Sequence, residues 1–439
     1  MSIEALSKQF PDVPVPILIK TDAIRIGVDF TPRAQQAVAK VNTCFKGYGV
    51  FSMDRDRGPV TIEQHIPHIF CLSEDDAVVS TRTTPTSPYK IDYIDGKFSF
   101  CDETGPVMGV YFPPAPSWID QKLDDGTPLQ AIAQPSGFDK VFCTLNYYCE
   151  YWKRGEQCRF CDIVSFLKVK KREEHGVVTR PRPEQVVETL KVAFREPGYR
   201  HIILTGGTVL THVDKQDEMR LYCDYLSRIR DEAFGGVWWS AYFQVGARPK
   251  ADIERLHTTG IPALHHNMEV WDEGLWPIIC PGKSRVVGRE EWVRRMIDSA
   301  EVFGKGHILS NFVSGVEMSK PYGFKTVKEA VKSTLSGFDY LMAHGVLPRM
   351  DMWCVEEGSG LAGQPPAPLE YYIELEKGYL DLRLKHGYPF PFVGYCRGCT
   401  SVDALSEWDY YFVKLPEKKA REAVALKPVA VPVSADGEE

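Results

Sequence analysis

Three cysteines, Cys149, Cys158 and Cys161, fall within thirteen consecutive positions and are the residues best suited to metal chemistry. Two residues separate Cys158 from Cys161, a spacing that lets two thiolates reach one metal, and Cys149 supplies a third. Three thiolates suit a cluster or metal ion that keeps one coordination position open for a small molecule. The alternative is a structural zinc site with four closed ligands, the fourth being Cys143 or His175.

A second pair, Cys396 and Cys399, has the same spacing near the end of the chain. Together with Cys280 or Cys354 it would hold an auxiliary iron-sulfur cluster. The alternatives are half of a small zinc site, or two reduced thiols without metal. The sequence therefore predicts one metal site and leaves a second one open.

The composition limits the classes of function. The 439 residues are 44% hydrophobic, which suits one large core or two ordinary ones, and a net charge of −7 with dispersed Lys and Arg argues against nucleic acid as a partner. The chain shows neither a signal peptide nor an apolar stretch of membrane-spanning length, so no membrane partner and a cytoplasmic location are expected. In a reducing compartment, twelve cysteines favour metal or catalytic roles over disulfides.

Short β-type runs alternate with amphipathic helical patterns, such as 186–194 and 292–303, and predict six β-then-α units. Right-handed crossovers then give a partial (β/α)6 barrel, too small to close as an ordinary eight-unit barrel. The chemistry of such folds lies beyond the C-terminal ends of the strands, and the three cysteines follow the first strand. The predicted strands are 141–145, 201–205, 237–243, 262–270, 307–313 and 347–355.

Three segments are expected along the chain. Residues 1–135 form a β-rich N-terminal module, because 90–102 alternates polar and apolar residues on both sides of an Asp95-Gly96 turn. Residues 136–390 form the barrel. Residues 391–439 carry the second cysteine pair, and the stretch after Leu415 has no core pattern and is expected to be disordered.

The cysteine motif, with the aromatic Phe160 just before its last cysteine, resembles that of the radical S-adenosylmethionine (SAM) superfamily. Within it, residues 265–273 at the end of the fourth strand resemble the corresponding segment of biotin synthase and lipoyl synthase. The usual motif has three residues in its first gap and this chain has eight, so 151–157 is interpreted as an insertion. The resemblance implies a [4Fe-4S] cluster held by Cys149, Cys158 and Cys161.

Further segments carry the same resemblance. Gly206 and Gly207 end the second strand, where the superfamily has a glycine pair that approaches the amino group of SAM. The family often has an acidic residue next, where this chain has Thr208. The resemblance implies that all three residues, with Phe160, contribute to cofactor binding.

Two later strand ends are similar to SAM-contacting segments of the superfamily. Asn267 and Glu269 end the fourth strand and would contact the ribose or the amino acid moiety of SAM. Gly315 and Glu317, after the fifth strand, resemble an element that lies near the adenine, although its first glycine is absent here. The similarity covers residues 141–386 and leaves the N-terminal module unexplained.

The resemblance implies an enzyme that reductively cleaves SAM at the cluster to a 5′-deoxyadenosyl radical, which abstracts hydrogen from a small-molecule or cofactor-precursor substrate. It also implies an electron donor such as flavodoxin or ferredoxin. Two alternatives remain open. One is a radical methyl- or sulfur-transferase that uses an auxiliary cluster at Cys396 and Cys399. The other is a non-catalytic, zinc-stabilised α/β binding protein.

Overall fold

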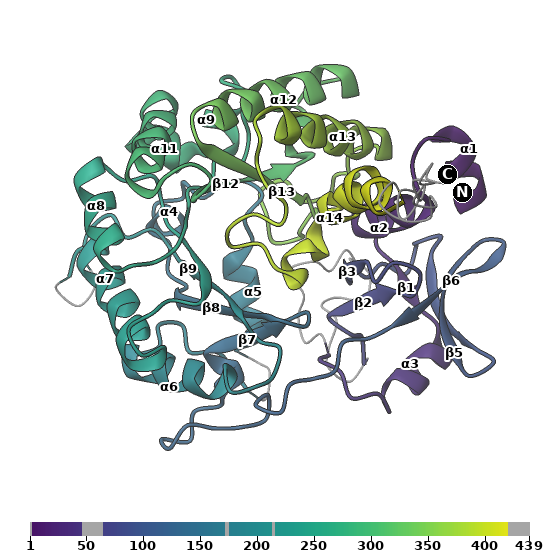
Figure 1. Cartoon of the computed structure of the whole chain (residues 1–439), viewed down its shortest axis with the longest axis horizontal. Coiled ribbons are helices and arrows are strands. Elements are labelled where there is room, and N and C mark those ends of the chain that lie inside the picture. The colour runs from purple at the N-terminus through teal and green to yellow at the C-terminus, as the bar shows by residue number, and fades with distance from the viewer. Residues whose placement is uncertain (1, 46–64, 172–174, 213–215, 420–439) are drawn as a thin grey trace, which may run out of the picture.

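The computed structural model describes residues 2–45, 65–171, 175–212 and 216–419. Its larger sheet has seven strands in the order β13-β12-β11-β10-β9-β8-β7, of which the six from β8 to β13 are parallel. The predicted partial (β/α)6 barrel is therefore present (Figure 1). Its strands are β7 Ala133–Ser136, β8 Lys140–Asn146, β9 His201–Gly206, β10 Ser240–Gln244, β11 Leu264–His265, β12 Ile308–Ser314 and β13 Val346–Met352.

Helices cover the outside of this sheet, and several begin with a side-chain cap. Asp217 accepts a hydrogen bond from the Arg220 N–H at the start of α7, and Thr326 caps α12 in the same way. The barrel helices are α4 Glu150–Lys153, α5 Ile163–Lys170, α6 Pro183–Ala193, α7 Glu218–Arg228, α8 Lys250–Thr258, α9 Trp276–Ile279, α10 Pro281–Val286, α11 Arg289–Phe303, α12 Val327–Ala343 and α13 Leu369–Lys385, with short turns of helix at η3 Ile229–Ala233 and η4 Val316–Met318.

The N-terminal segment forms a second, six-stranded sheet in the order β1-β4-β5-β6-β2-β3. The predicted hairpin is present, because Ile94 pairs with Lys97, and Asp95 and Gly96 both have positive φ. Three helices not expected from the sequence accompany this sheet. The elements are α1 Ile3–Gln9, α2 Val15–Ile26, β1 Asp29–Phe30, α3 Pro32–Val38, β2 Ile69–Leu72, β3 Val78–Ser80, β4 Lys90–Ile94, β5 Lys97–Asp102, β6 Gly105–Tyr111 and η2 Leu129–Ala131.

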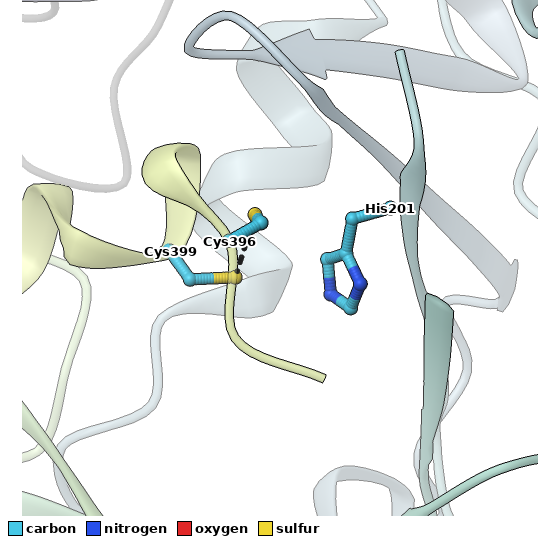
Figure 2. A group of neighbouring side chains, drawn as sticks. All are labelled: His201, Cys396 and Cys399. Carbon is cyan, nitrogen blue, oxygen red and sulfur yellow. Dashed lines mark hydrogen bonds between the residues drawn. The ribbon is translucent and has the colours of Figure 1, made fainter. Parts of the chain in front are cut away.

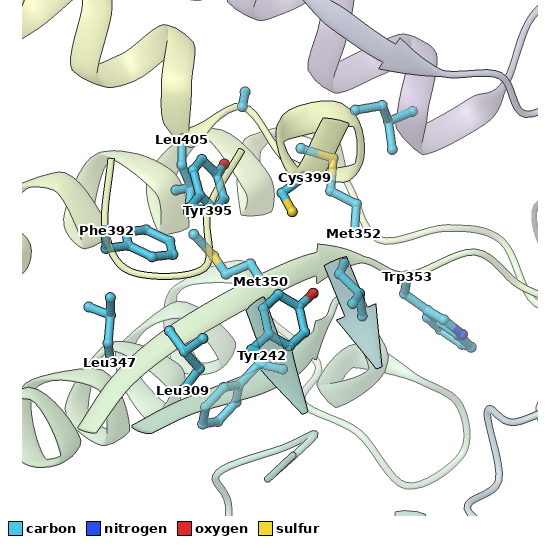
Figure 3. Packing of buried hydrophobic residues seen from close by; sticks show 14 of the residues in the cluster. Tyr242, Leu309, Leu347, Met350, Met352, Trp353, Phe392, Tyr395, Cys399 and Leu405 are labelled. Atoms are coloured by element: carbon cyan, nitrogen blue, oxygen red, sulfur yellow. The ribbon is translucent and has the colours of Figure 1, made fainter. Parts of the chain in front are cut away.

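The barrel sheet does not close on itself, since β13 and β7 are its two edges. The C-terminal segment, η5 Arg397–Val402, α14 Leu405–Asp409 and η6 Tyr410–Lys414, fills this opening: η5 contacts β8, β13 and β3. In Figure 1 it lies between the barrel and the N-terminal sheet. Buried side chains of the two parts pack together (Figure 3), namely Phe392, Tyr395 and Leu405 with Leu309, Leu347 and Met350.

One hydrophobic core runs through all three segments, from Ile3 to Trp408. The boundary predicted at residue 136 falls inside β7, which pairs with β8 and so belongs to the barrel sheet. The tail predicted to be disordered begins with residues 415–419, which are helical, and its remainder, 420–439, lies outside the described residues. Among the described residues, no helix is both long and apolar enough to span a bilayer.

Candidate functional site

The three motif cysteines lie directly beyond the C-terminal end of β8. Cys149 precedes helix α4, and Cys158 and Cys161 form a tight turn in which the Cys161 N–H donates to the Cys158 carbonyl at 3.0 Å. The indole N–H of Trp152 reaches the Cys161 Sγ at 3.4 Å. The insertion therefore supplies a hydrogen-bond donor to one of the predicted cluster ligands.

Burial raises the pKa of the Cys149 thiol, and it raises the pKa of Cys161 to about 12. A hydrogen bond with the Cys280 thiol, together with burial, raises the pKa of Cys158 well above its usual range. Without metal these thiols are therefore neutral at pH 7, and cluster binding must displace their protons. Cys143, a candidate fourth zinc ligand, is fully buried in the core and is absent from the cavity wall described below.

The insertion, residues 151–157, is docked on helices α9 and α10. The Gly282 N–H donates to the Glu156 carbonyl at 3.0 Å, and the Glu156 carboxylate forms an ion pair with Arg285. On the far side of the insertion, the Arg159 N–H donates to the Ile279 carbonyl at 2.8 Å. The extra residues thus form a fixed part of the barrel mouth.

Gly206 and Gly207 lie at the end of β9 and line the cavity, but their immediate neighbours are protein atoms. A Cβ on Gly206 would lie 2.1 Å from the Tyr222 hydroxyl, and one on Gly207 would lie 2.4 Å from the Tyr148 carbonyl oxygen. Gly206 is therefore required by close packing against Tyr222 of α7, and Gly207 by close packing against the start of the cysteine loop. Thr208 joins the same contact, since its carbonyl accepts from the Glu150 N–H at 2.9 Å.

The segment with Asn267 and Glu269 departs from the predicted strand 262–270, because β11 ends at His265 and Glu269 has a φ of 74°. Lys283 holds both residues: its Nζ lies 2.7 Å from the Asn267 carbonyl and 2.8 Å from Glu269 Oε1. Burial raises the pKa of Glu269, and Lys283 opposes that rise. The Glu269 carboxylate is thus already paired within the protein, and its contact with SAM stays a prediction.

Gly315 and Glu317 form a buried structural element beside β12. The Glu317 carboxylate accepts hydrogen bonds from the Gly315 N–H at 2.8 Å, from the Thr334 hydroxyl at 2.6 Å and from the Tyr371 hydroxyl. Gly315 has a φ of 104°, and a Cβ there would lie 2.5 Å from the Tyr372 hydroxyl. Neither residue contributes to the cavity wall, so their predicted role near adenine stays a prediction.

A cavity of about 510 Å³ fills the interior of the barrel. One end of the cavity is lined by Cys149, Cys161 and the glycine pair. The other end is lined by Cys399 and by Lys140, which is the first residue of β8. Apolar and aromatic side chains form much of the wall, and β2 and β3 of the N-terminal sheet close part of it. The residues concerned are Phe142, Tyr147, Ile163, Phe166, Ile203 and Tyr242, with His68, Ile69, Ser80 and Thr81 from the N-terminal segment.

The sequence did not single out Arg349, which lies on β13 and lines this cavity. Arg349 is 3% exposed. Its guanidinium donates to the Tyr242 hydroxyl at 3.3 Å and to the Cys399 carbonyl at 3.4 Å. Its Nε has no hydrogen-bond partner among the described residues. The carboxylate of Asp403 lies 3.8 Å away. His265, also on the wall, is neutral because burial lowers its pKa to about 3. A basic residue within a predicted strand does not by itself indicate a binding site, so only the fold shows that Arg349 faces the cavity.

The second cysteine pair lies at the opposite, N-terminal end of the barrel strands. Cys396 and Cys399 have their sulfur atoms 3.2 Å apart and face His201, the first residue of β9 (Figure 2). Of the two predicted partners of this pair, Cys280 contacts Cys158 instead. Neither Cys280 nor Cys354 belongs to the compact group of donors, in which His201 is the third member. Sequence distance hid this grouping, because 195 residues separate His201 from Cys396.

Residues 154–332 match the model of the Radical SAM superfamily. This segment is a radical SAM domain, and the match supports an enzyme of the radical SAM class, whose chemistry rests on an iron-sulfur cluster and SAM. The match argues against the non-catalytic zinc-protein alternative. The matched range contains Cys158 and Cys161 and begins after Cys149, so the complete ligand set stays a prediction.

A curated relative, bacteriochlorophyllide c C-7(1)-hydroxylase of Chlorobaculum limnaeum, is 21% identical over 323 residues, covering 72% of this chain and 77% of the relative. Methylornithine synthase (PylB) is 14% identical, with a TM-score of 0.37 over 70% of this chain and 94% of its own. The [FeFe]-hydrogenase maturase HydG is 12% identical, with a TM-score of 0.37 over 61% of this chain and 57% of the HydG chain. Coproporphyrinogen III oxidase (HemN) of Escherichia coli, a radical SAM enzyme, is 13% identical, with a TM-score of 0.36 over 63% of this chain and 60% of its own.

The described side chains around the cysteines fit a three-thiolate cluster better than a closed zinc site. A single zinc ion needs its donor atoms close together, since Zn–S distances are about 2.3 Å. Among the described residues, the three motif cysteines do not form such a compact group, whereas His201, Cys396 and Cys399 do. Cys149 and Cys161 also open onto the cavity, which leaves space next to the cluster position for a small molecule.

Proposed function

We propose that Cys149, Cys158 and Cys161 hold a [4Fe-4S] cluster on which SAM is cleaved, and that an organic substrate in the barrel cavity loses a hydrogen atom. The observation that carries this proposal is one continuous cavity of about 510 Å³ that reaches from two of these thiols to Arg349. When bound, the cluster and SAM supply a 5′-deoxyadenosyl radical, with the electron coming from a flavodoxin- or ferredoxin-like donor.

The residues of the chain have distinct tasks in this proposal. The three thiols hold the cluster at the barrel mouth, and Trp152 donates a hydrogen bond to one of them. The N-terminal sheet and the C-terminal segment close the barrel and exclude water from the reacting atoms. Phe160, which packs against the core beside the last cysteine, keeps the turn in place. Gly206, Gly207 and Thr208 fix the adjoining loop where SAM would enter.

The cavity also supports a class of substrate, namely an organic molecule with an apolar body and one acidic group. Aromatic and aliphatic side chains form much of its wall, and Arg349 presents a buried cation whose Nε lacks a partner among the described residues. The Asp403 carboxylate lies 3.8 Å from this cation without a hydrogen bond to it, so a bound carboxylate with direct hydrogen bonds would offset the cost of burying the cation more fully. From the hydroxylase relative we take only the kind of bond attacked, a C–H bond of an organic molecule.

The test is electron paramagnetic resonance of anaerobically reconstituted, reduced protein with and without SAM. We expect a [4Fe-4S]+ signal that changes when SAM is added, and that is lost when Cys149, Cys158 or Cys161 is replaced by alanine. Cys143→Ala is the matched control, because Cys143 is buried on β8, the strand that precedes the cysteine loop, and is absent from the cavity wall. Cys280→Ala must also keep the signal, since Cys280 only contacts Cys158.

A signal that persists without Cys149 but disappears without Cys280 would contradict the proposed ligand set. A signal that ignores SAM in the unaltered protein would contradict an open iron. Production of 5′-deoxyadenosine, measured by chromatography, gives an independent second readout.

A further inference from the structure

We propose that His201, Cys396 and Cys399 form a mononuclear zinc site that fastens the C-terminal segment to the bottom of the barrel. Their three donor atoms lie within 4.8 Å of one another, and no other group of three His, Cys, Asp or Glu donors among the described residues is so compact (Figure 2). This site is separate from the cluster motif, because it lies at the N-terminal rather than the C-terminal ends of the strands.

The histidine is oriented as a ligand. His201 is fully buried, its Nδ1 lies 2.9 Å from the Ser240 hydroxyl, and its Nε2 has no hydrogen-bond partner among the described residues. When Nδ1 donates to Ser240, Nε2 presents a lone pair to the thiols, which is the usual arrangement for a metal-binding imidazole. An unpartnered nitrogen at this depth is costly unless something binds it.

The turn that carries the cysteines is held by a second set of contacts. The Asp139 carboxylate accepts from the Arg397 N–H at 3.1 Å and the Gly398 N–H at 2.9 Å, and Lys140 Nζ donates to the Gly398 carbonyl at 3.1 Å. A Cβ on Gly398 would lie 2.3 Å from the Ser136 carbonyl oxygen. Only glycine lets the turn approach this closely, so the two thiols are placed by the barrel itself.

The donor set selects the metal. Two thiolates and one imidazole suit zinc, with Zn–S distances of about 2.3 Å and Zn–N distances of about 2.0–2.1 Å. Magnesium and calcium prefer oxygen ligands, and the group contains none. Among the described residues no fourth cysteine joins this group, which disfavours an iron-sulfur cluster with four thiolates.

Among the described residues, no further His, Cys, Asp or Glu donor occupies the fourth zinc position. His201 and Cys396 line an outer recess, whereas Cys399 lines the inner cavity, so the site separates the two spaces. Water from the recess would complete a tetrahedral site. The zinc would then keep the cavity sealed at the end opposite the radical chemistry.

The test is to measure the zinc and iron content of the full-length holoenzyme by mass spectrometry. X-ray absorption spectroscopy at the zinc edge then reports the zinc ligands without a contribution from iron. We expect one zinc per chain with two sulfur ligands and at least one nitrogen ligand. His201→Gln should lower zinc retention at least tenfold after dialysis against a chelator and leave the iron content unchanged. Cys223→Ser, a change at a half-buried cysteine on α7, is the matched control.

A paired variant, Cys396→Ser with Cys399→Ser, should lose zinc and speed hydrogen exchange in residues 391–402 while the exchange of 150–162 stays the same. Iron rather than zinc at the site, seen as extra iron that this pair removes, would overturn the proposal. So would a Cys396–Cys399 disulfide in the purified protein, or full zinc occupancy in His201→Gln.

Discussion

At the scale of single residues, the site region combines carboxylates that are already paired with a buried cation that keeps unused hydrogen-bonding capacity. Glu269 is neutralised by Lys283 at 2.8 Å, and the Glu317 carboxylate is filled by internal hydrogen bonds. Arg349, in contrast, has two long hydrogen bonds and an unpartnered Nε at the cavity wall. Free hydrogen-bonding capacity of a buried charge indicates where a ligand binds, so Arg349 is the residue we expect to recognise substrate.

Replacing Arg349 therefore tests the proposed class of substrate. We expect ring-containing carboxylic acids, but not their methyl esters, to stimulate 5′-deoxyadenosine formation by the unaltered enzyme. In Arg349→Met the concentration needed for stimulation should rise about 10- to 100-fold, which corresponds to the loss of a charge-assisted hydrogen bond.

The background cleavage of SAM without substrate serves as the internal control for folding and should stay the same in Arg349→Met. Arg349→Lys keeps the charge but loses the planar fork, so an intermediate response is expected. Equal stimulation by acids and esters would contradict an anionic substrate.

At the scale of elements, the long cysteine loop is stabilised by its contact with α9 and α10. Gly282 lies where the two meet: a Cβ there would be 2.4 Å from the Tyr151 ring and 2.6 Å from the Glu156 carbonyl oxygen. A carbonyl of the backbone cannot move aside as a flexible side chain would. The position of Cys158 thus depends on a residue more than 120 positions later in the chain.

Gly282→Ala should displace this loop and destabilise the protein by about 1–3 kcal/mol, the usual cost of overpacking. We also expect fewer iron atoms per chain after reconstitution, because the displaced loop no longer holds the three thiols where they can bind one cluster. Thermal unfolding and iron analysis provide the measurements. Gly246→Ala is the matched control, since its Cβ would meet the nearest atom, on Trp292, at an ordinary 3.6 Å. Identical iron content in the two variants would show that the contact is dispensable.

At the scale of the whole molecule, the C-terminal segment joins the N-terminal sheet to the barrel. Lys20 of α2 forms a buried ion pair with Glu407 of α14 at 2.8 Å, and Arg82 donates to backbone carbonyls of both α2 and the chain just after β13. On the barrel side, Glu376 of α13 accepts from the Ala404 N–H and the Trp408 indole, both at 2.9 Å. The cavity is therefore complete only when all three segments are folded together.

This junction makes stability depend on pH. Burial raises the pKa of Glu376 to about 8, well above the value of an unfolded glutamic acid, so the folded protein binds a proton that the unfolded chain releases. Its contribution is fully present at pH values below the unfolded pKa and is lost as the pH rises through about 8. Between pH 6 and pH 9 we expect the free energy of unfolding to fall by about 3 kcal/mol on this account.

Glu376→Gln should remove most of that decline, as measured by chemical denaturation at the two pH values. Glu374→Gln, an exposed position on the same helix, should leave it intact. The same decline in all three proteins would show that Glu376 is ionised in the folded state.

Local patterns in the sequence were enough to predict the barrel and the position of its cysteine motif. Alternating strands and amphipathic helices are short-range features, and five of the six predicted strands, including 141–145 and 201–205, match observed ones closely. The exception is 262–270, which is a strand only at Leu264–His265, because the backbone turns at Glu269 to meet Lys283. Three cysteines in one loop can be recognised for the same reason, since their spacing along the chain is also their spacing in space.

Tertiary structure alone decided which distant residues share a site. His201 meets Cys396 and Cys399, Arg349 faces the cavity beside Tyr242, and Cys280 contacts Cys158, because segments more than 100 positions apart in the sequence are neighbours in the folded barrel. Likewise, the glycines Gly206 and Gly207 were expected from their motif, but their reason is contact with Tyr222 and the Tyr148 backbone. Local sequence encodes the period of a strand or helix, whereas burial and donor geometry arise only when separate elements pack against each other.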